Sequence, residues 1–464
     1  MKKILLTAII IPSILFGQDR YQSGLGDSAF IKMISDNILV SRASYNNLYA
    51  LTKTVGGRLA GSPQMVKAEA WGYKTIQEAG ADKISLQECM VPHWIRGGKD
   101  EAFVTYKSAG GKKENMQLNI LALGNSAGSG VKGVEAPVVR VKDFDELEKR
   151  KDELKGKIVF YSVPFEETFV QTFQAYGKNV VYRAIGASRA AKYGAVAVLV
   201  RSMTHATDNN PHTGALHYLD SIPQIPAAAV GLRDVEKLNA ILDNNISVSA
   251  HLFTYGKMLP DTIGHNVIGE LTGTEFPDEI ITVGGHLDSW DVNEGAHDDG
   301  AGVVQTIEVL RAFKALGYQP KHTIRFVLFA NEENGTRGGK KYADEAKEKN
   351  EKHIFALESD AGGFTPRGFG FDVKPESWVK LESWKKLFEP YGGNTFSTGG
   401  DGADIGFLRE AFKTPLVGLQ PDTQRYFDVH HAVTDVFEAV NLRELKLGAV
   451  NMAALLYLVD KYGL

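Results

Sequence analysis

Four apolar runs in the second half of the chain are each followed closely by residues that can bind metals or transfer protons. These residues are His286, the pair Glu332 and Glu333, Asp360 and, further past its run, His431. The runs alternate with helical stretches, which predicts parallel strands joined by helices. The carboxyl ends of parallel strands meet at one edge of a sheet, where ligands bind. We therefore expect these distant residues to converge in one crevice.

Another carboxylate is expected beside them. Asp298 lies in the segment 297–302, at the start of a predicted helix whose apolar residues recur at helical spacing. Two imidazoles and three carboxylates form a donor set that suits zinc, with manganese or cobalt as alternatives. Carboxylates can bridge two ions. The sequence thus predicts a pair of metal ions held by these five residues: His286, Asp298, Glu333, Asp360 and His431.

A centre of two metal ions predicts that the protein is a hydrolase. Two divalent ions outweigh three carboxylates in charge, and a zinc-bound water can have its pKa lowered to about 7. Glu332 is next to a proposed ligand, so it is the expected general acid and base. Asp288, two residues after His286 on an extended segment, is expected to orient the imidazole.

The chain resembles the co-catalytic zinc exopeptidase family in four ordered strings: GHLDSWD at 285–291, GAHDDG at 295–300, NEENG at 331–335 and ESDAG at 358–362. The resemblance extends from the segment 56–62 to the final helix. It implies one metal held by His286 and Asp360, a second held by Glu333 and His431, and Asp298 as the bridge. It also implies that Glu332 is the general acid/base, and that the peptide bond after Asp298 is cis.

Two other histidines compete for the ligand roles. The family's spacing to Asp435 favours His431 over His430, and neighbours on an extended chain point in opposite directions. His297, beside Asp298, is expected to turn away from the metals as a surface or supporting residue.

The expected architecture is α/β, with a mostly parallel sheet and helices on both faces. Residues 18–123 and 247–464 are predicted to form the catalytic domain. Between them, the resemblance implies a protease-associated domain inserted at 124–246, which could roof the cleft. Earlier in the chain, Ser62 and Pro63 predict a helix that ends at Gly80. Its expected apolar stripe is Val66, Ala70, Tyr73 and Ile76.

Composition and the N-terminus narrow the class of protein. Residues 1–17 have the charged, apolar and small-residue order of a signal peptide, which predicts a secreted or periplasmic protein. No later run reaches the ~20 apolar residues of a membrane span, so no membrane partner is expected. With 52 basic against 56 acidic residues, the chain has no positive excess for nucleic acid. A single cysteine, Cys89, excludes a Cys-based zinc site.

The sequence therefore predicts a secreted two-zinc exopeptidase that acts on dipeptides or other small peptides. A broad aminopeptidase with the same metal centre is the first alternative, because the residues that would hold either end of the peptide are not identified. Arg337 and Arg425 are available bases near the motifs. A one-zinc glutaminyl cyclase and a receptor-like binding protein are more distant alternatives. The resemblance also suggests a homodimer.

Overall fold

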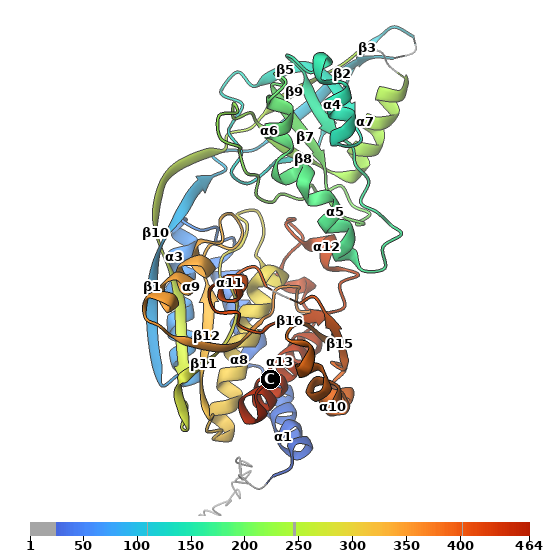
Figure 1. Ribbon diagram of the computed structural model, residues 1–464. Helices are drawn as coiled ribbons and strands as arrows, with labels where there is room; N and C mark the ends of the chain where they lie inside the picture. The colour runs from blue at the N-terminus through green and yellow to red at the C-terminus, as the bar shows by residue number, and fades with distance from the viewer. Residues whose placement is uncertain (1–24, 109, 245–246, 401) are drawn as a thin grey trace, which may run out of the picture.

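The computed structural model describes residues 25–108, 110–244, 247–400 and 402–464, which form two stacked layers, each built on one sheet (Figure 1). The predicted signal peptide at 1–17 lies outside the described residues. Among the residues described, no helix is both long and apolar enough to span a bilayer. The C-terminus lies in the lower layer of Figure 1.

The lower layer contains the sheet that ends in the predicted metal residues. Its strands lie side by side in this order: β1 (Lys83–Ile95), β10 (Lys257–Leu271), β12 (His322–Phe329), β11 (Phe276–His286), β13 (Lys352–Glu358), β16 (Leu416–Pro421), β14 (Pro366–Asp372) and β15 (Thr395–Thr398). The four apolar runs of the sequence form β11, β12, β13 and β16, which are mutually parallel. The prediction of these four strands is confirmed.

The prediction of a mostly parallel sheet was wrong. β1 pairs antiparallel with β10, β10 pairs antiparallel with β12, and β14 pairs antiparallel with β16. The long β1–β10 ribbon is amphipathic and partly exposed, so its strands lack the continuous apolar pattern of a buried parallel strand. The sheet is therefore mixed, with a parallel block at its centre.

Helices cover both faces of this sheet, as predicted. Contacts with α8 (Ala301–Leu316) place α1 (Asp27–Val40), α2 (Ala43–Ala50), α3 (Pro63–Ala79) and α13 (Leu442–Tyr462) on one face. The other face carries α9 (Arg337–Glu348) and α11 (Gly406–Phe412), and α10 (Trp378–Phe388) lies beside β15. Side chains alternate accordingly along β12: Phe326 and Leu328 pack in the α8 core, whereas Val327 and Phe329 pack under α9 and α11.

The upper layer contains a second mixed sheet. Its strand order is β3 (Lys113–Leu118), β2 (Glu101–Lys107), β9 (Val248–Phe253), β5 (Val134–Val141), β6 (Ile158–Tyr161), β7 (Ala197–Arg201), β8 (Ala227–Val230) and β4 (Ile120–Ala122). Its helices are α4 (Phe144–Lys149), α5 (Thr172–Ala184), α6 (Gly186–Ala191) and α7 (Leu232–Asn244). The sheet draws on residues 101–253, a wider stretch than 124–246. Its assignment to a protease-associated domain, like the domain boundaries, stays a prediction.

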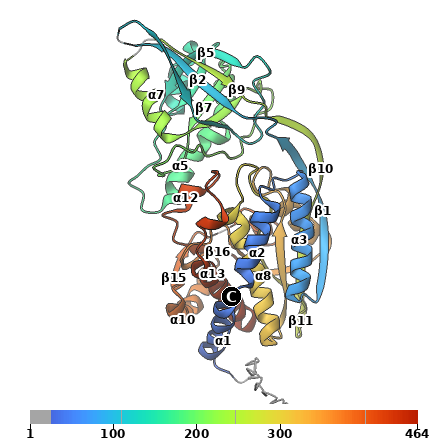
Figure 2. The same cartoon turned by 180° about the vertical axis from the view of Figure 1, so that it is seen from behind.

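The two layers meet through α5 and α12 (Tyr426–Val429), which lie side by side in both views (Figures 1 and 2). Phe173 of α5 stacks on Tyr426, with 5.5 Å between ring centroids, and Tyr176 stacks on Phe427 at 5.0 Å. Tyr426 and Phe427 belong to one buried apolar cluster, against which Tyr176 packs, whereas Phe173 is 40% exposed. The β1–β10 ribbon is the second connection, because it curves from the lower sheet up to the upper layer. Short helical turns complete the fold: η1 (Leu51–Val55), η2 (Lys151–Glu153), η3 (Ala296–Gly300), η4 (Pro375–Ser377), η5 (Glu389–Tyr391) and η6 (Phe437–Ala439).

The helix predicted after Ser62 is α3, and its ends are as expected. Ser62 Oγ accepts a hydrogen bond from the backbone N–H of Met65, and Gly80 ends the helix with a left-handed φ of 96°. Of the predicted apolar stripe only Ile76 is buried, whereas Val66 is 60% exposed. The buried face of α3 also includes Met65, several small residues and Glu69, which bonds to His265 on β10.

Asp460 of α13 fixes the start of β12 and supports a stability prediction. Its buried carboxylate accepts hydrogen bonds from the Tyr318 hydroxyl and from the backbone N–H groups of Lys321 and His322. Asp460→Asn replaces an acceptor oxygen by a donor, so we expect a loss of about 1–3 kcal/mol in the free energy of unfolding. The urea midpoint checks this. The exposed control Asp344→Asn should change stability by less than about 0.5 kcal/mol, and equal effects would contradict the assignment.

Candidate metal centre

The five predicted ligand residues converge at the carboxyl ends of the parallel block. His286 Nε2 lies 3.2 Å from Asp298 Oδ1 and 3.5 Å from Asp360 Oδ1. On the other side, His431 Nε2 lies 3.1 Å from Glu333 Oε2 and 3.3 Å from Asp298 Oδ2. The arrangement is thus two half-sites, each with one imidazole and one carboxylate of its own, and Asp298 lies between them.

Two carboxylate oxygens in this cluster lack hydrogen-bond donors. Among the described residues, Asp298 Oδ2 and Glu333 Oε1 are buried and accept no hydrogen bond. An unsatisfied buried carboxylate is costly, and a cation removes that cost. Burial, and then the neighbouring charge of Asp298, raise the pKa of Glu333 well above its ordinary value. The donor set and these atoms fit divalent metal ions such as zinc.

The segment that carries Asp298 is fixed by two neighbouring carboxylates. Asp435 accepts hydrogen bonds from the backbone N–H groups of His297, at 2.7 Å, and of Asp298, at 3.1 Å. Asp299 accepts from the backbone N–H groups of His286 and Gly302. The peptide bond between Asp298 and Asp299 is cis, as the resemblance implied. Hydrogen bonds to Asp435 and Asp299 therefore hold in place the backbone around Asp298.

His297 turns away from the cluster, as expected for a supporting residue, but it does not lie on the surface. Its ring stacks on Phe364 at 4.0 Å between centroids. Its Nδ1 accepts a hydrogen bond from the backbone N–H of Gly363, and the residue is buried.

Asp288 lies against the imidazole of His286 and also contacts the loop that carries the two glutamates. Its carboxylate Oδ1 is 3.6 Å from His286 Nδ1, whereas its own backbone carbonyl oxygen is 3.1 Å from that nitrogen. The carboxylate accepts instead from the backbone N–H groups of Glu332, at 2.9 Å, and of Glu333, at 3.3 Å. Asp288 thus contacts His286 through its backbone and holds the loop that carries both glutamates.

Glu332 lies at the edge of the cluster, with Oε2 4.0 Å from His286 Nε2. Burial is the main cause that raises the pKa of its carboxyl group to about 8. A carboxyl group whose pKa is raised toward neutrality can both accept and return a proton.

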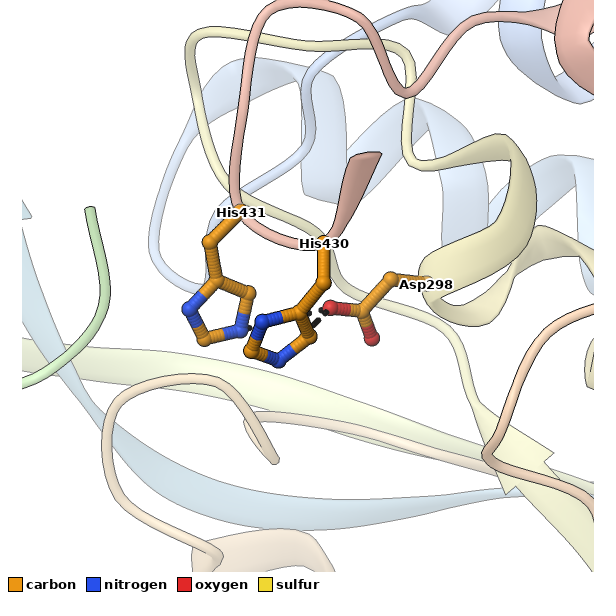
Figure 3. A group of neighbouring side chains, drawn as sticks. All are labelled: Asp298, His430 and His431. Carbon is orange, nitrogen blue, oxygen red and sulfur yellow. Dashed lines mark ion pairs between the residues drawn. The ribbon is translucent and has the colours of Figure 1, made fainter. Parts of the chain in front are cut away.

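His430 and His431 both face Asp298, which corrects the expectation that they diverge (Figure 3). Their rings stack with centroids 3.6 Å apart, and His430 Nε2 is 3.7 Å from Asp298 Oδ2. The chain is not extended here, because His431 has a left-handed φ of 62°. Of the two, His431 also approaches Glu333, whereas His430 pairs with no second carboxylate among the described residues.

Sequence reasoning missed the role of Arg58. This side chain is fully buried and donates hydrogen bonds to the carbonyl oxygens of Leu287, Glu294 and Gly295. It therefore ties together the loop between His286 and Asp298. The segment 56–62 was noted only as part of the resemblance, and nothing local in it marks the carbonyl groups that Arg58 reaches.

A cavity of about 340 Å³ opens beside the cluster and has walls from both layers. The lower layer contributes Asp298, Glu332 and Asp360, and the upper layer contributes Tyr176 and Arg183 from α5. A larger hollow of about 980 Å³ on the upper sheet shares none of these residues, and its charged side chains include paired ones such as Arg150 with Glu146. Of these two cavities, only the one beside the cluster would therefore place a bound molecule in contact with the candidate metal residues.

Known proteins resemble this chain along most of its length. The model of peptidase family M28 matches residues 266–456. Carboxypeptidase Q of Homo sapiens is 36% identical over 416 residues, which cover 90% of this chain and 85% of the relative; the Mus musculus protein is 35% identical with the same coverage. A crystal structure of a peptidase M28 precursor from Shewanella amazonensis SB2B has a TM-score of 0.87 and 31% identity, covering 94% of this chain and 96% of that chain. An aminopeptidase from Aneurinibacillus sp. strain AM-1 shares the fold, with a TM-score of 0.62 and 20% identity over 93% of this chain and 96% of that chain.

The different surroundings of the two adjacent histidines give a prediction for metal content. His431→Ala removes the imidazole that lies between Glu333 and Asp298, so we expect zinc per chain to fall after dialysis against zinc-free buffer. His430→Ala, the matched control, should retain the zinc content of the unmodified protein. Elemental analysis by mass spectrometry measures both. Full zinc in His431→Ala, with loss in His430→Ala, would reverse the assignment.

Proposed function

We propose that this chain, which belongs to peptidase family M28, is a two-zinc exopeptidase that hydrolyses dipeptides and other short peptides. Family membership makes it a metallopeptidase. The observation that supports a two-zinc centre is that His286 and His431 lie on either side of the Asp298 carboxylate. Among the described residues, the Oδ2 atom of Asp298 is buried without a hydrogen-bond donor.

In this proposal His286 and Asp360 would hold one zinc ion, Glu333 and His431 would hold the other, and Asp298 would contribute its carboxylate to both. The interatomic distances support this division, because each imidazole Nε2 lies near Asp298 and one further carboxylate. Bound zinc supplies Lewis-acid polarisation of the scissile carbonyl group and lowers the pKa of water.

Glu332 is proposed as the general acid and base. It lies beside the ligand residues, lines the cavity and forms no ion pair with a lysine or arginine among the described residues. As base it takes the proton of the attacking water, and as acid it returns a proton to the leaving amine. Asp288 positions Glu332, because the carboxylate of Asp288 accepts a hydrogen bond from the backbone N–H of Glu332.

The cavity supports small substrates. Its volume is about 340 Å³, and α5 with α12 closes it on the side of the upper layer. We propose that the upper layer, with an insert at 124–246 between catalytic segments 18–123 and 247–464, restricts entry to short peptides. Export through the signal peptide at 1–17 belongs to the same proposal.

Substitution of Glu332 tests the proton-transfer role. Glu332→Gln should keep both zinc ions and the fold but lower kcat by about 100-fold or more, because the amide cannot accept the proton. The control Glu348→Gln changes an exposed glutamate of α9 and should leave kcat unchanged. Turnover of alanyl-alanine, followed by release of free alanine, measures both variants. Near-normal turnover in Glu332→Gln would overturn the role.

Metal removal and blocked peptides test the reaction class. We expect alanyl-alanine to be cleaved, the cleavage to stop with a chelator, and activity to return as zinc reaches two ions per chain. A tetra-alanine peptide that is acetylated and amidated should resist cleavage, because an exopeptidase needs a free end. Full activity at one zinc ion per chain would contradict the two-zinc centre. Absence of any metal-dependent cleavage would favour a cyclase or a binding protein.

A further inference from the structure

Two residues of the upper layer, His212 and Thr213, bind the loop of the adjacent histidines; we call these two residues the clamp. They are buried in the loop between β7 and β8. The backbone N–H of Thr213 donates to the carbonyl oxygen of His431, at 3.0 Å, and the carbonyl oxygen of Thr213 is 3.2 Å from His431 Nδ1. His212 Nδ1 is 2.7 Å from the carbonyl oxygen of His430. A carbonyl oxygen only accepts hydrogen bonds, so this nitrogen is the donor.

The clamp fixes both the backbone and the ring of a proposed metal ligand. His431 has a left-handed φ of 62°, which costs a residue other than glycine free energy and persists only where neighbouring contacts hold it. When Nε2 of His431 binds a metal, Nδ1 carries the proton and donates it to the carbonyl oxygen of Thr213. A second group near Nδ1, Arg183 Nη1 at 3.3 Å, also belongs to the upper layer. The orientation of this imidazole therefore depends on the upper layer.

Another contact connects the upper layer to the loop of Glu333. Asn334 Nδ2 donates to Asn125 Oδ1 at 3.1 Å, and Asn125 Nδ2 is 3.4 Å from the carbonyl oxygen of Asn334. Asn125 follows β4 of the upper sheet, whereas Asn334 comes directly after Glu333 and is buried. The upper layer thus contacts the loops of both Glu333 and His431, which together we call the second half-site.

The first half-site, His286 with Asp360, is held within the lower layer. The backbone N–H of His286 donates to the carboxylate of Asp299, and its Nδ1 faces the carbonyl oxygen of Asp288. The serine before Asp360 donates its backbone N–H to a carbonyl group of β11 and its hydroxyl to a glutamine of α8. Within the part of the chain that the structure describes, neither His286 nor Asp360 forms a hydrogen bond or an ion pair with the upper layer. The two half-sites therefore differ in what supports them.

The clamp is fixed to the upper sheet. The backbone N–H of His212 donates to Ser202 Oγ, directly after β7, and the hydroxyl of Thr213 donates to the carbonyl oxygen of Ala122 on β4. Gly214, the next residue, has a φ of 131°, and the neighbouring guanidinium leaves no space for a side chain there. Because the loop is bonded to two strands of the upper sheet, the position of the clamp follows the position of that sheet.

We propose that the upper layer is a structural part of the second half-site, so that zinc binds tightly there only while the two layers are packed together. The first half-site depends on the lower layer alone. This inference rests on the proposed two-zinc function. His212 and Thr213 are positioning residues in it, because they act through His431. The linkage is reciprocal, so the second zinc ion in turn strengthens the contact between the layers.

Zinc titrations against a competing chromophoric chelator test the clamp, because they give a separate affinity for each ion. His212→Ala removes the donor to the carbonyl group of His430, so it should weaken the second zinc ion about 10–100-fold and leave the first unchanged. His212→Asn places an amide N–H near the position of Nδ1 and should keep most of the affinity. The matched control His205→Ala removes a histidine of the same loop that bonds to Phe165, within the upper layer. It should change neither affinity.

A double substitution identifies the affected ion. His431→Ala leaves the first half-site intact, so adding His212→Ala to it should not change the affinity of the remaining zinc ion. Equal weakening of both ions by His212→Ala alone, or a further loss in the double variant, would show a general destabilisation and would overturn the inference.

Hydrogen exchange tests the same linkage without altering the clamp. Binding of the second zinc ion to the unmodified protein should slow exchange in a peptide that spans residues 207–216, and His431→Ala should abolish this slowing. Two bound zinc ions with unchanged exchange, or with unchanged affinities in His212→Ala, would overturn the inference while leaving the two-zinc function standing. Saturation of the unmodified protein at one zinc ion per chain would instead contradict the proposed function, and this inference with it.

Discussion

Concentrated negative charge at the carboxyl ends of the parallel strands is the constraint on which the rest of this structure depends. Asp298, Glu333 and Asp360 lie within a few ångströms of one another's imidazole partners, and two of their oxygens lack donors. Isolated carboxylates do not tolerate such burial. The surrounding chain fixes two of the segments that carry these carboxylates, because Asp435 accepts the N–H groups of His297 and Asp298, and Asp288 accepts that of Glu332.

The second layer completes the site rather than merely covering it. α5 and α12 pack through aromatic rings, and this contact brings a cation of the upper layer beside a histidine of the lower layer. The cavity consequently has an acidic side from the sheet and a basic point from α5. The packing of α5 against α12 therefore sets the distance between this cation and the carboxylates of the lower layer.

Some predictions made from local sequence patterns were wrong for identifiable physical reasons. The ends of α3 were predictable from Ser62 and Gly80, since capping is local. Most of its buried face was not, because small residues and a bonded Glu69 lie on it beside Ile76. Likewise, alternation on an extended chain predicted that His430 would turn away. A left-handed residue at His431 stacks the two rings instead, and tertiary contacts determine that backbone conformation.

The sequence by itself determined the donor set, the four parallel strands and the edge at which His286, Glu333 and Asp360 meet, because apolar runs and the residues after them are local features and parallel strands end on one side. Only the tertiary structure decided which group each supporting residue serves. Asp288 holds the glutamate loop as well as lying against the imidazole ring of His286, and Arg183, about 250 residues before His431, carries no local sign that it lies beside that histidine. The burial of Arg183 and its hydrogen bond to Tyr176 are properties of the folded chain.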